Sequence, residues 1–359
     1  MKPPKPHRRI LLVHHVDSYS GSPHVLAQVA KIAMARGLEC TVLTTPGGGF
    51  LADLSGVRHW WLRSRFGKPT RMPSSIAFLA LQLEECAYLV RARVEGIQAI
   101  YLNTLFHPLP ALLSRLLFAH RVVHAHEVPR PLFVGKILAR VASLGVRRVF
   151  HPTRYAMEML GVSDNPRNEV VPCGVEEIPD PSDPVARYRF PLVVMAASLA
   201  VYKGAHLFVE LARRMPDLSF RLALGASRED SLRSLGEPPS NLEILCQCRD
   251  RVRIFGDATV VVCATIPRLR AENFAVSVGE AMAWGIPVVI PPVGGMVERV
   301  VDGENGFLVD PEDLVSMVAA IRRILSSQDG YLSFSRAARE VRCSMEDFAR
   351  PVEEFLSEV

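Results

Sequence analysis

The sequence predicts an α/β protein built from two successive doubly wound parallel sheets. Three observations support this prediction. A chain of 359 residues is too long for one ordinary hydrophobic core. Short apolar runs alternate with helical patterns, which is typical of the right-handed βαβ crossovers that build a parallel sheet. The alternation stops at a proline-rich stretch, Pro179–Pro184, and then starts again, as expected where a linker leads into a second domain.

In the first half of the chain, short apolar runs predict strands and longer periodic segments predict helices. The predicted strands are Arg9–His14, Glu39–Thr44, Val57–Leu62, Ala99–Leu102, Arg121–Ala125 and Arg148–Pro152, with a last strand and turn at Val170–Val175. The predicted helices are His24–Arg36, Ser74–Val94, Leu109–Phe118 and Pro131–Ala142. Gly37 ends the first of these helices.

The second half repeats the same alternation after the linker. The predicted strands are Leu192–Ala197, Ser219–Leu224, Thr259–Cys263, Pro287–Ile290 and Gly306–Val309. Helices are predicted at Gly204–Arg214 and Pro311–Leu325, and within Ala271–Trp284 from about Ser277. We therefore expect a first domain over residues 1–180 and a second over 181–340. A terminal helix within 341–359 is expected to pack back onto the first domain.

Composition restricts the classes of protein that the chain can belong to. Hydrophobic residues make up 49% and charged residues 22%, as in a soluble globular protein. No apolar run reaches the roughly 18 residues that a membrane span needs. The first nine residues are basic and proline-rich, which is not typical of a signal peptide. Seven scattered cysteines indicate a reducing cytoplasm, and the pair Cys246 and Cys248 lacks the further ligands of a metal site.

Charge is distributed unevenly along the chain. Residues 1–180 hold 22 Lys and Arg against 13 Asp and Glu, a balance of +9, and the remainder holds 20 against 24, a balance of −4. The basic half contains a segment that mixes aromatic and basic side chains, which suits an anionic membrane surface or single-stranded nucleic acid. Alternatively, its tryptophans belong to a core strand and its charges are solvated. The candidate contacts are Trp60, Trp61, Arg63, Arg65, Phe66, Lys68 and Arg71.

The most informative segment for function is 270–289, which contains Glu272 and Glu280. A helix that starts near Ser277 leaves Glu272 in the preceding loop and Glu280 in the first turn. The amides of that turn form an anion site, where a nucleotide diphosphate could bind while Glu280 accepts hydrogen bonds from ribose hydroxyls. Glu272 could then orient sugar hydroxyls. The alternative is that both glutamates are solvated charges on an amphipathic helix.

The surroundings of these glutamates resemble glycosyltransferase family 4. The resemblance rests on this segment with its Gly-Ile-Pro-Val-Val ending, on Gly294–Glu298 and on Asp302–Val309. It extends over nearly the whole chain through weaker matches, which are the loop around Gly21, His126 after a strand, the segment 170–175, and Lys203 with Gly204. The family implies the GT-B fold, with two Rossmann-like domains facing a central cleft, and transfer that retains the anomeric configuration of the donor.

The resemblance implies a role for each matching residue. Lys203 would hold the donor diphosphate and stabilise the leaving nucleotide. Glu272 would contact the sugar, Glu280 the ribose, and His126 the sugar near the reacting centre, unless His126 is a structural histidine. Asn273, Phe274 and Ala275 would present backbone amides to the sugar or phosphate, and Gly21 and Ser22 would shape the loop below the donor phosphates. Ser198 would belong to the same donor site. The end of the first strand is a candidate acceptor pocket, lined by His14, His15 and Asp17.

Three departures from the family pattern affect donor binding. Ser198 stands where the family usually carries an arginine, so that the diphosphate loses a cationic partner unless Arg268 or Arg270 replaces it. Pro23 follows Gly21 and Ser22 where a second glycine is usual, and proline has no amide hydrogen. Glu-Asn-Phe-Ala replaces the usual Glu-Gly-Phe-Gly.

We therefore expect a retaining transferase that moves a sugar from a UDP- or GDP-linked donor to an acceptor hydroxyl, in cell-surface polysaccharide, glycolipid or natural-product glycoside synthesis. The sequence contains no Asp-x-Asp, so no metal or other cofactor is expected. We expect a cytoplasmic protein, peripheral at the inner face of the membrane, and no nucleic acid partner. Two alternatives remain, which are a GT-B nucleotide-sugar epimerase and a degenerate homologue that acts as a non-catalytic binding subunit.

Overall fold

The computed structural model describes residues 8–64, 74–175, 183–341 and 344–359. The chain divides into two compact units, and each is considered by itself. Unit 1 contains Met1–Gly174 together with Glu346–Val359, and unit 2 contains Val175–Met345. The last helix of the chain is thus part of the first unit. The predicted linker, 179–184, lies mostly outside the described residues, as does the N-terminal tail.

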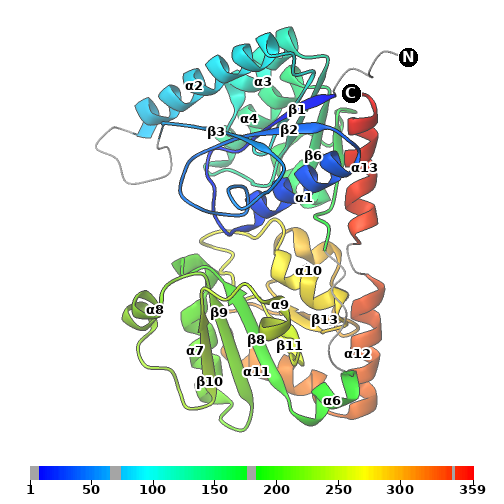
Figure 1. Ribbon diagram of the computed structural model, residues 1–359. Coiled ribbons are helices and arrows are strands. Elements are labelled where there is room, and N and C mark those ends of the chain that lie inside the picture. The colour runs from blue at the N-terminus through cyan, green and yellow to red at the C-terminus, as the bar shows by residue number, and fades with distance from the viewer. Residues whose placement is uncertain (1–7, 65–73, 176–182, 342–343) are drawn as a thin grey trace. The chain divides into compact units, whose positions relative to one another are not determined.

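Unit 1 is built on a seven-stranded parallel sheet in the order β3-β2-β1-β4-β5-β6-β7 (Figure 1). Strand numbers increase outward in both directions from β1, as in the Rossmann arrangement. The crossovers on the two sides of β1 therefore diverge between β1 and β4. The strands are β1 Arg9–Val13, β2 Glu39–Thr44, β3 Arg58–Trp61, β4 Ala99–Leu102, β5 His120–His124, β6 Arg148–His151 and β7 Asn168–Val170.

Helices cover both faces of this sheet, and both faces are apolar. On one face a hydrophobic core joins the strands to α2, α3, α4 and α5. The other face carries α1 and α13 (Figure 1), where Phe355 of α13 lies 6.1 Å from the ring of Tyr101 on β4. The helices are α1 Gly21–Ala35, α2 Ser74–Val94, α3 Pro108–Leu117, α4 Leu132–Gly145, α5 Arg154–Leu160 and α13 Met345–Ser357.

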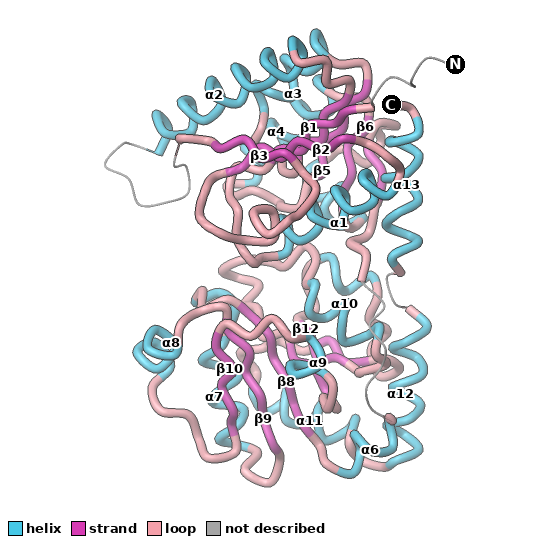
Figure 2. Tube along the Cα trace, in the orientation of Figure 1, coloured by secondary structure: helices cyan, strands magenta, loops and turns pink. Residues whose placement is uncertain are grey.

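Unit 2 repeats this topology with six parallel strands in the order β10-β9-β8-β11-β12-β13 (Figure 2). One core packs the sheet against α7, α11 and α12, and a second packs it against α9 and α10. The strands are β8 Leu192–Ala197, β9 Ser219–Leu224, β10 Leu242–Cys246, β11 Val260–Val262, β12 Val288–Ile290 and β13 Gly306–Leu308. The helices are α6 Pro184–Arg189, η1 Val201–Lys203, α7 Ala205–Arg214, α8 Arg228–Leu235, α9 Arg251–Phe255, α10 Val276–Ala283, η2 Gly295–Glu298, α11 Leu314–Ile324 and α12 Gln328–Glu340.

The predicted fold class, two parallel-sheet α/β units, is confirmed. Some boundaries differ from the prediction. Helix α1 begins at Gly21, three residues early, because Pro23 sits in the first turn, where its missing amide hydrogen costs nothing. Helix α10 begins at Val276, so that Glu280 is its fifth residue and lies beyond the first turn. In the described part of the chain, no helix is both long and apolar enough to cross a membrane.

Candidate functional site

The main charged cluster of unit 2 joins Lys203 and Glu272. Lys203 ends η1, just after β8, and its Nζ donates to Oε1 and Oε2 of Glu272 at 2.8 and 2.6 Å. The Oγ1 of Thr265, in the loop after β11, donates to Oε2 of Glu272 at 3.3 Å. Because β8 and β11 are neighbours whose crossovers diverge, this cluster lies at the switch point, where open α/β sheets bind ligands.

Lys203 is a cation at neutral pH. Burial lowers the pKa of its ammonium, but the adjacent carboxylate of Glu272 outweighs this effect, and the pKa of Lys203 is raised overall. The side chains of Lys203 and Glu272 are each 21% exposed, so that both remain accessible to a ligand. Tyr202 lies between two cations, with Lys203 Nζ 5.5 Å and Arg270 Cζ 5.2 Å from its ring centre. The cluster therefore concentrates positive charge beside one carboxylate.

The N-terminus of α10 adds backbone donors to unit 2. Its N-cap residue, Ala275, has an extended backbone and no side chain that could cap the helix, so the first amides of α10 are left for other acceptors. Further along the helix, the Glu280 side chain is only 13% exposed, and its Oε2 accepts a 3.0 Å hydrogen bond from Nη1 of Arg251. Neither predicted glutamate is therefore a solvated surface charge.

Two glycines allow the close backbone approaches on which this geometry depends. Gly204 has φ +71°, and a Cβ there would lie 2.0 Å from the carbonyl oxygen of Ala264. Gly294 has φ +115°, and a Cβ there would lie 2.2 Å from the carbonyl oxygen of Glu272. That oxygen instead accepts a hydrogen bond from the Gly295 amide at 3.0 Å. Residues other than glycine rarely adopt such backbone angles, so these positions fix where Lys203 and Glu272 lie.

In unit 1, a hydrogen-bonded chain crosses the corresponding switch point between β1 and β4. The Nε2–H of His126 donates to Oδ1 of Asn103 at 2.8 Å, and Nδ2 of Asn103 donates to the Ser22 carbonyl at 2.9 Å. The hydroxyl of Ser22 lies 3.2 Å from Nε2 of His14. Burial, followed by the neighbouring His124 and His151, holds the pKa of His126 well below its usual value, so its ring is neutral at pH 7.

The remaining acceptor-side residues have structural surroundings of their own. Both carboxylate oxygens of Asp17 accept backbone hydrogen bonds, from the amides of Leu51 and Ala52 at 3.1 and 2.9 Å. Asp17 therefore holds the loop after β2 in place. His15 is partly buried, and its ring centre lies 5.3 Å from that of His14 and 5.4 Å from that of His107.

The structure thus brings some of the predicted residues together in each unit and leaves Asp17, Ser198 and Glu280 with other neighbours. Unit 1 joins Ser22, His14 and His126, and Gly21 and Ser22 are the first residues of α1, not of a loop as predicted. In unit 2, Lys203 and Glu272 meet. Asn273, Phe274 and Ala275 lead into α10. The ring of Phe274 packs close to Gly279, since a Cβ added there would lie 3.4 Å from the ring.

Ser198 is exposed after β8. The two arginines considered as its replacement differ in position. Arg268 forms an exposed ion pair with Glu312 at 2.6 Å, whereas Arg270 lies over Tyr202 beside Lys203. Arg270 is therefore the better placed of the two to contact a phosphate.

Sequence reasoning missed Asn103, Thr265 and Arg251. Asn103 and Thr265 each follow a strand at the switch point, so the rule that placed His126 at the end of a strand could have found them. Arg251 does not follow a strand end at the switch point, and its separation of 29 residues from Glu280 gives no sequence pattern that would pair the two. Cys246 and Cys248 have separate neighbours, Ser231 and the Asp250 carbonyl.

The aromatic and basic segment is only partly available at the surface. Trp60 is 5% exposed and packs against Tyr88 and beneath Arg91, so the expectation that it contacts a membrane is wrong. Trp61 is 41% exposed and stacks on His59. Arg63 is exposed, and these residues line a pocket of about 740 Å³ at β3. The predicted contacts Arg65, Phe66, Lys68 and Arg71 lie outside the described residues.

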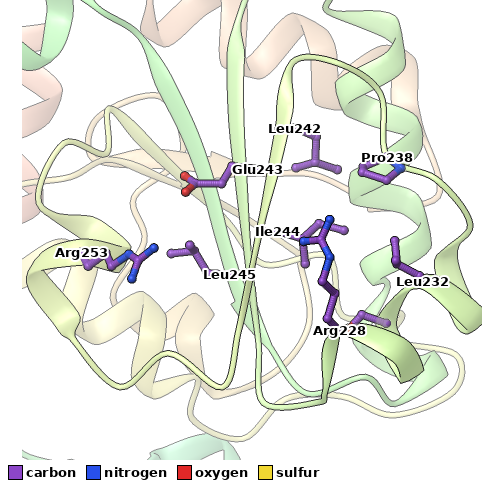
Figure 3. Close-up of a pocket in the computed structure, with 9 residues that line it drawn as sticks. Arg228, Leu232, Pro238, Leu242, Glu243, Ile244, Leu245 and Arg253 are labelled. Carbon is purple, nitrogen blue, oxygen red and sulfur yellow. The ribbon is translucent and has the colours of Figure 1, made fainter.

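A second pocket, of about 330 Å³, lies at the β10 edge of unit 2 (Figure 3). Arg228 and Arg253 line it from either side of β10, with Glu243 between them (Figure 3). The Glu243 carboxylate is already paired with Arg221 at 2.7 Å. This pocket contains none of the predicted donor residues, because the edge strand is remote in the sheet order from β8 and β11.

Comparison with solved structures defines the class of fold. The structure of Anabaena HepE in complex with UDP-glucose superposes with a TM-score of 0.76 at 19% identity, over 98% of this chain and 100% of that one. Sucrose-phosphate synthase from Thermosynechococcus elongatus gives a TM-score of 0.78 at 18% identity, over 98% and 99%. These neighbours are glycosyltransferases with the GT-B fold, so the predicted GT-B fold is confirmed.

Sequence comparison then narrows the class. Residues 190–327 match the family model described as glycosyl transferases group 1. A GDP-mannose-dependent alpha-(1-6)-phosphatidylinositol monomannoside mannosyltransferase of Mycolicibacterium smegmatis is 27% identical over 60% of this chain and 63% of its own length. A D-inositol 3-phosphate glycosyltransferase of Xylanimonas cellulosilytica is 28% identical over 49% and 47%. The matches to these curated relatives thus span about half to under two thirds of each relative's length. The predicted resemblance to glycosyltransferases is confirmed.

Proposed function

We propose that the chain is a retaining glycosyltransferase that moves a sugar from a UDP- or GDP-linked donor to an acceptor hydroxyl. The observation that carries this proposal is the Lys203–Glu272 pair at the switch point of unit 2, next to the uncapped N-terminus of α10. A lysine ammonium and free backbone amides that follow neighbouring strands of one sheet can bind the negative charges of a diphosphate. The match to group 1 glycosyl transferases covers the same residues.

The geometry supports a role for each group. The ammonium of Lys203 binds the diphosphate and stabilises the negative charge that develops as the nucleotide leaves. Donor binding would then loosen the bond between Lys203 and Glu272, so that Glu272 can accept hydrogen bonds from sugar hydroxyls. Glu280, held by Arg251, is placed to accept hydrogen bonds from the ribose. This neutralisation needs no metal ion at the diphosphate, which agrees with a sequence that contains no Asp-x-Asp.

Known proteins support both candidate nucleotides. A relative of this chain is described as GDP-mannose-dependent, and a structural neighbour was solved with UDP-glucose. On the acceptor side, His126 is proposed to contact the sugar near the reacting centre, with His14 nearby in the same hydrogen-bonded chain. The acceptor hydroxyl attacks the anomeric carbon on the face from which the phosphate departs.

We also propose that the protein works in the cytoplasm, at the inner face of a membrane. The basic balance of the first half and the exposed Trp61 and Arg63 support contact with anionic lipid. One relative of the chain is named for a phosphatidylinositol mannoside acceptor, which is a lipid.

A second candidate is a non-catalytic binding subunit. Ser198 favours it, because an exposed serine stands where a cation would assist the leaving group. The other alternative is a GT-B nucleotide-sugar epimerase. Nucleotide release and conversion of the donor sugar distinguish these two candidates from the transferase. A transferase releases nucleotide only when an acceptor is present, an epimerase converts the donor without one, and a binding subunit does neither.

The experiment screens UDP- and GDP-sugars by thermal shift, since a ligand of the folded state raises the melting temperature. Calorimetry and nucleotide release then follow for the parent and three variants. We expect Lys203→Ala to lower turnover about 100-fold or more and Glu280→Ala to weaken nucleotide affinity about tenfold. Arg268→Ala removes an exposed cation of unit 2 and serves as the control. Parent-like behaviour of both site variants would show that the donor site lies elsewhere.

A further inference from the structure

Three histidines of unit 1 come together outside the proposed donor site. His14 and His15 follow β1, and His107 is the N-cap residue of α3. One ring nitrogen from each lies within 4.8 Å of those of the other two. Among the described residues, they form a group of three histidine, cysteine or acidic side chains that lie close enough together to hold one metal ion.

Two of these rings carry a buried nitrogen whose role the fold does not explain. His14 uses Nε2 toward Ser22, while its Nδ1 is buried and makes no hydrogen bond in the described structure. His107 uses Nδ1 toward Glu85 at 2.9 Å, while its Nε2 is likewise buried and makes none there. The two residues are only 5% and 1% exposed. Buried polar atoms that lack a partner call for an explanation, and a bound ion is one.

Glu85 gives the second indication of a cation. Its carboxyl group is fully buried and, within the described structure, its ion pairing is with His107 and not with a lysine or arginine. A buried carboxylate is unfavourable unless a positive charge lies nearby. Histidines that bind metals usually donate their other ring N–H to a carboxylate, which orients the ring. The contact between Glu85 and His107 has this form.

We propose that His14, His15 and His107 bind one divalent zinc ion, with Glu85 orienting His107. Imidazole nitrogens are preferred zinc ligands. Nitrogens on tetrahedral zinc lie about 3.3 Å apart, since Zn–N bonds are about 2.0–2.1 Å. Small rotations of the three rings would therefore close the site. A fourth position remains for an oxygen ligand, either water or a hydroxyl group.

This inference goes beyond the proposed function, which assigns no metal to unit 1. Its test uses the full chain, purified without a polyhistidine tag, stripped with a chelator and dialysed. Calorimetric titration with Zn²⁺ is expected to give one site per chain. Titration with Co²⁺ is expected to give the visible absorption of a tetrahedral site with nitrogen ligands and no thiolate charge-transfer band, which separates this site from binding by cysteines.

The variants locate the site. We expect His14→Ala and His107→Ala to abolish the Zn²⁺ and Co²⁺ signals, with folding checked by circular dichroism. Glu85→Gln preserves side-chain size and is expected to weaken Zn²⁺ binding about 10- to 100-fold. His206→Ala, on the exposed face of α7, and the Cys246→Ser/Cys248→Ser pair are the controls and should bind Zn²⁺ like the parent.

The outcomes are separable from the proposed function, because no donor or acceptor is present in the titration. The proposal is overturned if the parent binds no Zn²⁺, if its Co²⁺ spectrum shows thiolate ligands, or if binding survives in the folded histidine variants. Loss of one Zn²⁺ per chain in the histidine variants, together with weakening in Glu85→Gln, supports it even if no sugar transfer is found.

Discussion

Arg251 shows how one side chain can set the position of another, here the Glu280 carboxylate that we propose binds the ribose. Its guanidinium donates to Glu280 at 3.0 Å and holds that carboxylate on α10. Arg251 is 30% exposed and Glu280 is 13% exposed, so the pair lies between a surface and a buried ion pair. A pair of this kind is worth about 1 kcal/mol or less, and its main effect is on geometry.

We therefore predict that Arg251→Met weakens nucleotide binding about three- to fivefold and leaves turnover at saturating donor nearly unchanged. The loss is smaller than for Glu280→Ala, because the carboxylate itself remains. Calorimetry with the nucleotide and steady-state kinetics measure the two parts separately. Arg253→Met, on the same helix α9, is the matched control. A fall in turnover without loss of affinity would show that Arg251 acts elsewhere.

Buried histidines make the stability of unit 1 depend on pH. Burial lowers the pKa of His151 to about 4, although its hydrogen bond to Asn168 opposes the change. In the unfolded chain the same ring titrates near its usual value of 6.5. Between about pH 6.5 and 4, the unfolded state therefore binds a proton that the folded state does not, and the free energy of unfolding falls as the pH is lowered.

We predict that His151→Gln reduces this pH dependence. One such histidine contributes a slope of at most about 1.4 kcal/mol per pH unit within that window and none well above pH 6.5. Urea unfolding at several pH values between 4 and 8 measures the slope. His206→Ala removes an exposed histidine and should leave the slope unchanged. Identical slopes for His151→Gln and the parent would mean that His151 is not buried in its neutral form.

At the scale of elements, the loop before α10 is positioned by backbone contact more than by side chains. Glu272 and Gly294 form an isolated parallel bridge that ties this loop to the segment after β12. We predict that Gly294→Ala lowers the free energy of unfolding by about 1–3 kcal/mol, because its φ of +115° disfavours any Cβ. The same change displaces Glu272 and lowers donor affinity.

Gly225→Ala is the control for this prediction, since a Cβ there meets nothing within 4 Å. Thermal unfolding and donor titration of both variants give the comparison. Equal donor affinity for Gly294→Ala and Gly225→Ala would show that the bridge does not position Glu272.

Some elements of the fold could be predicted from the sequence and others could not. Strands such as β2 and β8 were predicted with the bounds that the structure gives, because parallel strands that are largely buried on both faces are rich in apolar residues. The missed elements include α5, α6, α8, α9, α12 and β10. Helix α8 is short and largely polar, α9 is only five residues long, and β10 is a short edge strand interrupted by the charged Glu243.

The site was predictable to a similar degree. The family motif supplied Lys203 and Glu272, and the structure shows that they form an ion pair. Asn103 and Arg251 could not be paired with their partners from spacing alone, because those contacts join segments 23 and 29 residues apart through the sheet. Contacts of that kind depend on strand order, and the sequence pattern does not specify strand order.

At the scale of the whole molecule, the two units repeat one topology. In each sheet the first strand of the unit lies beside the fourth, β1 beside β4 and β8 beside β11. The candidate residues gather at that position in both units, Asn103 and His126 in one and Lys203 and Thr265 in the other. The switch point thus explains both clusters with one rule.

The chain leaves unit 1, builds unit 2 and returns to unit 1 through α13, so one face of the first sheet lacks part of its helical cover until the last residues are made. The α13 residues Phe348 and Phe355 are buried, and their rings lie against His124 and Tyr101. We predict that Phe355→Ala lowers the free energy of unfolding of unit 1 by about 3–5 kcal/mol.

This loss should be confined to unit 1. Two of the three tryptophans, Trp60 and Trp61, report on unit 1, so a Trp284→Phe background follows that unit alone during urea unfolding. Glu346→Ala, on the exposed side of α13, should change stability by less than about 0.5 kcal/mol. Nucleotide binding by unit 2 should persist in Phe355→Ala, because both cores of unit 2 are made by its own residues. If Phe355→Ala destabilises unit 1 and also abolishes nucleotide binding, the two units are coupled in stability and α13 stabilises the whole chain.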